Sequence, residues 1–115
     1  MAIRKIETQD FDSRVIASES PLVVLFEAEW CPFCTQFRGI LERRVDNIDI
    51  PVVAVRLNDY DNPLWERFSI GAVPTLAMFE NGAMVFRIDS PLGIGLDDSD
   101  VTKLIDFVRT RTHKA

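Results

Sequence analysis

Cysteine and histidine are scarce in this chain of 115 residues, which contains two cysteines and one histidine. Two cysteines are too few for the disulfide framework of a small secreted domain. No second Cys-x-x-Cys pair is present and His113 lies near the C-terminus, so a mononuclear zinc site is disfavoured. We therefore expect no metal site. A structural disulfide between cysteines three positions apart would close too small a loop to stabilise the fold much.

Positive charge is also in the minority, since 13 Lys and Arg face 18 Asp and Glu, a net charge of −5. This balance argues against nucleic acid as the main partner. No apolar run approaches membrane-spanning length, and the first residues, MAIRKIETQD, lack the apolar segment of a signal peptide. We expect no membrane partner, a cytoplasmic location and a single domain over residues 1–115.

The hydrophobic pattern predicts alternating strands and helices. Strands are expected at Ala2–Ile6, at LVVLFEA after Pro21, at Ile50–Leu57, and at TLAMFE and AMVFRI on either side of Asn81-Gly82. Helices are expected at Gln9–Ser18, at Pro32–Val45, from Pro63, and in a final segment capped by Asp97, Asp98 or Ser99. This order predicts an α/β fold, a mixed central sheet of about five strands with helices on both faces.

Both cysteines lie in the segment EAEWCPFCTQF, where a buried strand gives way to a helix. The helix N-terminus offers unpaired N–H groups and the positive end of the helix dipole, which favour a thiolate at Cys31. Two intervening residues allow the sulfurs to meet within one turn. Cys31 could then attack a substrate disulfide and Cys34 could resolve the mixed disulfide. Cys34 should be the more buried, because Phe37 and Leu41 follow it on the same side of the helix.

Two segments about 40 residues apart, AEWCPFC and FSIGAVPTLAMFENG, resemble the thioredoxin family. The resemblance extends from about residue 3 to residue 108, with the elements in the order of the family. It implies a thioredoxin-like fold, with Cys31 attacking and Cys34 resolving. It also implies that Pro74 is a cis proline, which exposes the Val73 backbone for pairing with an extended substrate.

The substrate is expected to contact Trp30, Pro32, Phe33, Val73 and Pro74 in such a site. Phe33 should be partly exposed, because a substrate must approach over it. The loop DSPLGIGLDD, residues 89–98, is about three residues longer than is usual in the family. It could form part of the substrate surface or be a neutral insertion.

Several residues depart from the pattern of the family. Pro32-Phe33 replaces the Gly-Pro of the reductases and resembles the Pro-Tyr of glutaredoxins. Leu25 occupies the position of the buried acid that helps to deprotonate the resolving cysteine. Glu27 points the same way on an alternating strand and could substitute as a pKa modulator, or it could be an exposed carboxylate at the end of the strand. Arg56 falls where the family often carries a lysine, so it could retain that charge or be a solvated arginine.

These features favour an enzyme, a thiol-disulfide oxidoreductase that reduces or exchanges protein disulfides, with roles in electron transport and cell redox homeostasis. We expect a monomer with no cofactor beyond its redox-active disulfide. A thioredoxin-reductase-like enzyme or glutathione would supply the electrons. One alternative is a glutaredoxin-like, glutathione-dependent oxidoreductase, although the Gly-Gly-Asp type of glutathione-binding turn is absent. The other is a non-catalytic module that bridges an iron–sulfur cluster between subunits or only binds partners.

Overall fold

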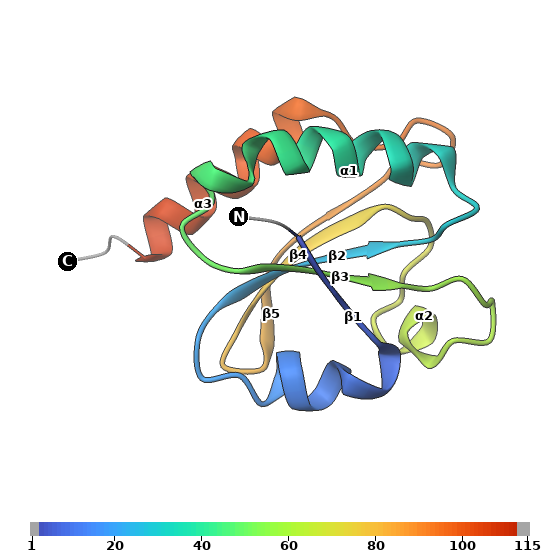
Figure 1. Ribbon diagram of the computed structural model, residues 1–115, viewed down its shortest axis with the longest axis horizontal. Helices are drawn as coiled ribbons and strands as arrows, with labels where there is room; N and C mark the ends of the chain where they lie inside the picture. The colour runs from blue at the N-terminus through green and yellow to red at the C-terminus, as the bar shows by residue number, and fades with distance from the viewer. Residues whose placement is uncertain (1–2, 113–115) are drawn as a thin grey trace.

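Five strands form one central sheet in the computed structural model, which describes residues 3–112. The strands are β1 (Arg4–Ile6), β2 (Leu22–Glu27), β3 (Val52–Arg56), β4 (Thr75–Glu80) and β5 (Ala83–Asp89). They lie in the order β1-β3-β2-β4-β5 (Figure 1). The expected mixed sheet is therefore confirmed. Ala2 and His113 lie outside the described residues.

The direction of each strand follows from its connection. β1, β3 and β2 run parallel because helical segments join them, whereas β4 is antiparallel to both β2 and β5. Asn81 and Gly82 have φ of 52° and 79°, so both adopt the left-handed conformation that a two-residue hairpin turn requires. All six residues of β2 are buried, as its continuous apolar run predicts for a strand covered on both faces.

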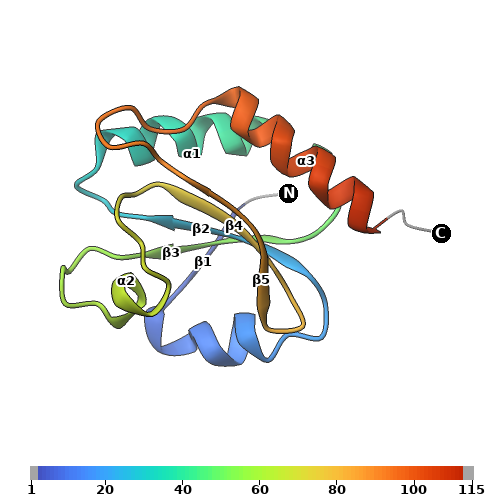
Figure 2. The same ribbon diagram turned by 180° about the vertical axis from the view of Figure 1, so that it is seen from behind.

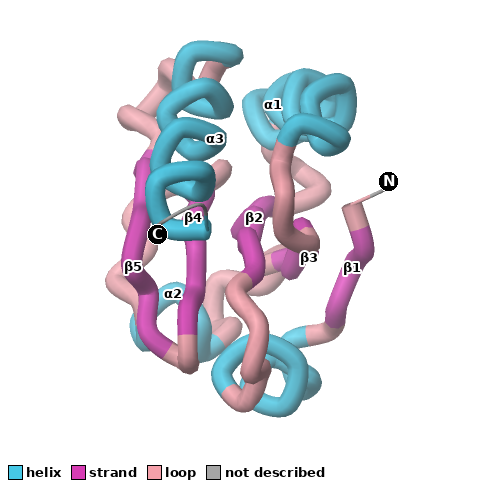
Figure 3. Tube along the Cα trace, turned by 90° about the vertical axis from the view of Figure 1, so that its left-hand side faces the viewer, coloured by secondary structure: helices cyan, strands magenta, loops and turns pink. Residues whose placement is uncertain are grey.

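Helices cover both faces of the sheet. α1 (Pro32–Arg44) and α3 (Asp98–Thr112) lie on one face, and α2 (Pro63–Arg67) and the N-terminal helical turns lie on the other (Figure 3). Asn62 caps α2 by accepting the Leu64 N–H, and Asp97 caps α3 by accepting the N–H groups of Ser99 and Asp100. No helix within residues 3–112 has the length and apolar character needed to cross a membrane.

The helix predicted at Gln9–Ser18 is not a regular α-helix. It is a 3₁₀ turn, η1 (Thr8–Asp10), followed by a π-helical turn, η2 (Asp12–Ile16), in which the Ala17 N–H donates to the Asp12 carbonyl at 2.8 Å. Phe11, at the junction, and Val15 are both buried against the sheet. The packing of these two side chains outweighs the regular periodicity that the sequence suggests. Elsewhere, predicted elements differ from the observed ones by a few terminal residues.

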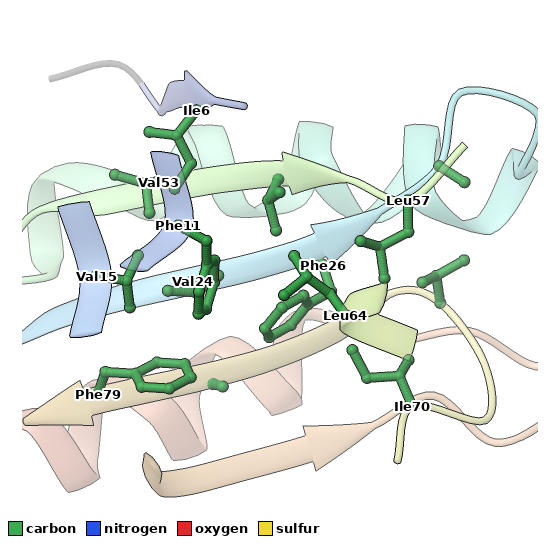
Figure 4. Packing of buried hydrophobic residues seen from close by; sticks show 14 of the residues in the cluster. Ile6, Phe11, Val15, Val24, Phe26, Val53, Leu57, Leu64, Ile70 and Phe79 are labelled. Atoms are coloured by element: carbon green, nitrogen blue, oxygen red, sulfur yellow. The ribbon is translucent and has the colours of Figure 1, made fainter. Parts of the chain in front are cut away.

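Two apolar cores lie on opposite faces of the sheet. On the side of η2 and α2, Val24 and Phe26 of β2 pack with Phe11 and Phe79 (Figure 4). The Phe11 ring centroid lies 6.0 Å from that of Phe26 and 5.7 Å from that of Phe79. The alternate residues of β2, including Leu25, face the other core beneath α1 and α3. β2 is therefore anchored on both faces just before the chain reaches the cysteine pair.

Candidate active site

Cys31 is the N-cap of α1, with Pro32 at the first helical position. Its backbone is extended, with φ of −99° and ψ of 111°, and this turns the side chain back over the first turn of the helix. The Cys34 N–H donates to Cys31 Sγ over 3.2 Å. The sulfur thus receives one of the backbone N–H groups that have no partner within a helix, an arrangement that favours the thiolate.

The two cysteines differ in their surroundings. Both are free thiols, and Cys34 is 1% exposed against 5% for Cys31, so the expectation that Cys34 is the more buried is confirmed. Burial raises the pKa of the Cys34 thiol, and its interaction with Cys31 raises it further. Cys34 therefore holds its proton while the neighbouring sulfur faces the amides of the helix.

The peptide bond between Val73 and Pro74 is cis, as the resemblance implies, and it lies against the cysteine pair. The Cys31 thiol donates to the Val73 carbonyl at 3.5 Å. Pro74 is itself held in place, because its carbonyl accepts the Ser90 N–H at 3.1 Å. The turn before β4 thus brings one backbone polar group, the Val73 carbonyl, to the reactive sulfur.

An apolar groove of about 380 Å³ opens beside Cys31. Its lining is uncharged and comes from segments far apart in the sequence: Trp30, Cys31, Pro32, Phe33, Tyr60, Trp65, Gly71, Ala72, Val73, Ser90, Leu92 and Gly93. Of the expected substrate contacts, only Pro74 is absent from the lining, and it is buried. The groove therefore brings together four of the five predicted contact residues.

Tyr60 and Trp65 form, with Trp30, an aromatic wall that sequence reasoning did not assign to the site. Tyr60 stands between the two tryptophans, with ring centroids 5.5 Å from Trp30 and 6.4 Å from Trp65. The indole N–H of Trp30 donates to the Asn58 carbonyl and that of Trp65 to the Asp59 carbonyl, both at 2.9 Å. These bonds fix the loop after β3, so that Tyr60 is held over the groove while it is 82% exposed. No spacing in the sequence signals this wall, because it depends on the fold of that loop.

The loop between β5 and α3 reaches the N-terminal end of α1 in both ribbon views (Figures 1 and 2). Gly95 lies directly on the Phe33 ring, where an added Cβ would come within 3.0 Å of it, and its φ is +83°. Phe33 is therefore only partly exposed, as expected. Leu92 lines the groove and is 87% exposed, whereas Ile94 is exposed but lies outside the groove.

Glu27 is buried, with 4% of its surface exposed, so the interpretation of it as an exposed carboxylate at the end of a strand is wrong. Its Oε2 atom lies 3.3 Å from Arg38 Nη2 and 3.7 Å from Arg56 Nε. Arg56 also pairs with Glu29, so it is not a solvated arginine. Arg38 was not predicted, although it follows Cys34 by four residues and hence lies one turn further on the same side of α1.

The charge of Glu27 is only partly compensated. Burial raises the pKa of its carboxyl group, against the opposing effect of Arg38 and Arg56. Among the described residues, Glu27 Oε2 and Arg38 Nη1 are the buried side-chain polar atoms that make no hydrogen bond. After burial and the Cys31 thiol, the charge of the Glu27 carboxylate raises the pKa of Cys34 a little further. Glu27 borders a hollow of about 240 Å³, whose other lining residues are Ala28, Glu29, Thr35, Arg38 and Arg56.

The cysteine pair lies at the start of a helix and faces a cis proline, where the inner strand β2 ends and the inner strand β4 begins. This arrangement defines the site of a thiol-disulfide oxidoreductase. The family model described as Thioredoxin matches residues 2–106, and the chain therefore belongs to the thioredoxin family. Thioredoxins are protein-disulfide oxidoreductases, and the chain is an enzyme of this class.

Relatives and solved structures agree with this assignment. The chain is 35% identical over 101 residues to a probable thioredoxin-2 of Caenorhabditis elegans, an alignment that covers 87% of this chain and 67% of that protein. It is 30% identical over 78 residues to a thioredoxin of Rickettsia bellii, which covers 67% of this chain and 74% of the relative. The long form of spinach chloroplast thioredoxin f superposes with a TM-score of 0.76 at 18% identity, over 94% of this chain and 87% of that chain. This superposition confirms the thioredoxin fold.

Proposed function

We propose that the protein reduces disulfides in other proteins through a two-cysteine exchange. The observation that carries the proposal is the placement of Cys31 Sγ, which accepts the Cys34 N–H at 3.2 Å and opens onto the apolar groove. The bond from the Cys34 N–H stabilises this sulfur as a thiolate, and the groove gives it access to a substrate. Both are needed for a nucleophile in disulfide exchange.

The exchange has two displacement steps. In the first, the Cys31 thiolate bonds to one sulfur of the substrate disulfide, the substrate S–S bond breaks, and the other substrate sulfur leaves as a thiolate. In the second, Cys34 loses its proton and attacks Cys31 Sγ, which forms the Cys31–Cys34 disulfide and releases the second substrate sulfur. The substrate has then gained two electrons and two protons, and the enzyme has been oxidised by the same two electrons.

The substrate would approach as an extended segment alongside Val73, whose carbonyl lies 3.5 Å from Cys31 Sγ. Backbone pairing of this kind holds a segment with little regard to its sequence. Trp30, Pro32 and Phe33 would contact the side chains beside the substrate cysteine, since they line the groove, and Pro74 would orient the Val73 backbone through the cis bond between them.

Glu27 would accept the proton of Cys34 in the second step. A carboxyl group with a raised pKa is a stronger base than an exposed one. The hollow beside Glu27 gives the proton a route to solvent. Arg38 and Arg56 would limit the rise in the pKa, so that the carboxylate remains available near neutral pH.

Replacing Glu27 by glutamine should slow the resolution step about 100-fold and leave the first attack by Cys31 unchanged. Below the Glu27 pKa the carboxyl group is protonated and cannot accept a proton, so the wild-type resolution rate should rise with pH at values above the ordinary pKa of 4.5. Glu27→Gln should lose that rise. Stopped-flow fluorescence of Trp30, beside the site, would follow the formation and decay of the mixed disulfide.

Glu29→Gln is the matched control, because Glu29 also pairs with Arg56 but is exposed. A second readout is independent of turnover. Because the folded-state pKa of Glu27 is raised, this group favours folding most at low pH, and its contribution is lost as pH rises through the folded pKa. Unfolding measured against pH should show this decrease in the wild type and not in Glu27→Gln. Equal resolution rates in the two variants would contradict the role given to Glu27.

Electrons for the next cycle would come from a thioredoxin-reductase-like enzyme or from glutathione, and the protein would act in the cytoplasm as a monomer without a bound cofactor. The family membership supports the first donor. The Pro-Phe pair between the cysteines resembles that of glutaredoxins. If it shifts the potential to glutaredoxin-like values, the change is roughly 40–70 mV and gives a weaker reductant.

A direct comparison of substrates separates this function from its alternatives. We expect insulin to be reduced at a rate at least about tenfold above that of a glutathione mixed disulfide, because the groove favours an apolar polypeptide segment over a small charged peptide. Rapid turnover of the glutathione mixed disulfide alone would instead favour a glutaredoxin-like function. A coloured, iron-dependent dimer after anaerobic purification would favour the cluster-bridging module.

A further inference from the structure

We infer that the groove beside Cys31 selects protein disulfides in which a large apolar residue adjoins the cysteine and a basic residue follows it. Leu92 lines the groove, and the exposed residues Asp59 and Asp61, here called the acidic rim, flank Tyr60 of the lining. This inference rests on the proposed function and names the class of substrate that the same site prefers.

Leu92 is presented to the groove by a loop that is held in place. The carbonyl of Pro91 accepts the N–H groups of Ile94 at 3.1 Å and of Gly95 at 3.4 Å, and Gly95 rests on the Phe33 ring. A side chain that is 87% exposed on such a loop contributes little to the stability of the fold. An apolar side chain held in solvent beside an apolar groove is typical of a contact surface for a partner.

The position of the reactive sulfur limits what can occupy the groove. Cys31 lies in its lining, so an occupant that reacts must place a disulfide there and its neighbouring side chain between Leu92 and the aromatic wall of Trp30, Tyr60 and Trp65. A volume of about 380 Å³ is near the lower end of the range of ligand pockets, roughly 300–1,000 Å³. The groove therefore suits one large apolar side chain rather than a folded surface.

Two carboxylates lie in the loop that contributes Tyr60 to the groove. Asp59 and Asp61 flank Tyr60, and both are exposed. The loop that carries them is tied down through the carbonyls of Asn58 and Asp59, which accept the two indole N–H groups. A basic residue in the substrate, just beyond the apolar one, would meet this rim and gain from charge complementarity.

Among residues 3–112, no basic side chain forms an ion pair with Asp59 or Asp61. Arg56 already contacts Glu27 and Glu29, and Arg87 pairs with Asp89. The lining of the groove is itself uncharged. The two carboxylates beside Tyr60 therefore favour a cationic partner.

Four disulfide-linked peptide dimers would test the inference, with Phe-Arg, Phe-Glu, Ser-Arg or Ser-Glu placed next to the cysteine. The second-order rate of reduction should be about tenfold higher for phenylalanine than for serine and about fivefold higher for arginine than for glutamate. The second preference should disappear at 1 M salt, where charges are screened beyond about 3 Å. Equal rates for the four peptides would overturn the inference.

Variants assign each preference to its residues. Leu92→Ser should reduce the preference for phenylalanine, and Asp59→Asn with Asp61→Asn should abolish the preference for arginine. Ile94→Ser, in the same loop but outside the groove, should keep both. Each result is a ratio of rates within one variant, so a general loss of activity does not affect it. Unchanged ratios in the first two variants would refute the inference.

The small hydroxyethyl disulfide, tested on the wild-type protein, separates the two proposals. If neither it nor any peptide is reduced, the proposed function itself is wrong. If it and all peptides are reduced without a preference, only the inference about the groove fails.

Discussion

Replacing Cys31 by serine is expected to lower the rate of protein-disulfide reduction by at least about a thousandfold. The oxygen of serine is not ionised near neutral pH and does not form the mixed disulfide, so it cannot replace the Cys31 sulfur as the nucleophile. No other group in the groove can take the place of that sulfur. Insulin reduction at neutral pH, with dithiothreitol as electron donor, measures the loss. Because serine is close to cysteine in size, the variant should remain folded, and circular dichroism would verify this.

Cys34→Ser is the matched variant and should behave differently. It retains the attacking thiolate but cannot resolve the mixed disulfide, so covalent enzyme–substrate complexes should accumulate. Non-reducing gels and mass spectrometry would detect them. If Cys31→Ser accumulated such complexes and Cys34→Ser did not, the two roles would have to be exchanged. If Cys31→Ser retained turnover, the exchange mechanism would be wrong.

Phe11→Ala is expected to lower the free energy of unfolding by about 3–5 kcal/mol. Phe11 is 1% exposed, and its ring contacts those of Phe26, Phe68 and Phe79. Removing it leaves a cavity where η1 and η2 meet the sheet. Natural domains are stable by only about 5–15 kcal/mol, so the loss is a large part of the total. Urea denaturation would measure it.

The same truncation at a half-buried site provides the control. Phe107 lies on α3, and its ring packs against that of Phe86 in a tilted arrangement at a centroid distance of 4.9 Å, but it remains partly exposed. Phe107→Ala should cost about 1–2 kcal/mol. A loss for Phe11→Ala no larger than this would show that the N-terminal turns contribute little to the stability of the fold.

The sheet could be predicted from the sequence because its strands are marked by strong local signals. The continuous apolar run of β2 and the Asn-Gly pair at residues 81–82 each specify a local structure that no tertiary contact has to correct. The N-terminal helical turns could not be predicted in detail. Their geometry depends on how Phe11 fits among rings contributed by other elements, which is a property of the packed core.

The cysteine pair could be predicted because its chemistry constrains the spacing, and the cis proline because the segment around it resembles the thioredoxin family. The status of Glu27 could not be settled from the chain alone, since burial at the end of a strand depends on the arginines that cover it. Tyr60 was missed for a related reason. Its place in the site comes from two indole hydrogen bonds, one from the distant Trp30 and one from Trp65, six residues along from its acceptor.

The contact between Gly95 and Phe33 has a consequence for redesign of the redox potential. Phe33, one of the two residues between the cysteines, also supports the loop before α3. Grafting another dipeptide between Cys31 and Cys34 would remove that contact with the loop. It would therefore alter the recognition surface together with the redox potential. An engineered change of redox poise in this protein therefore has to redesign two segments at once.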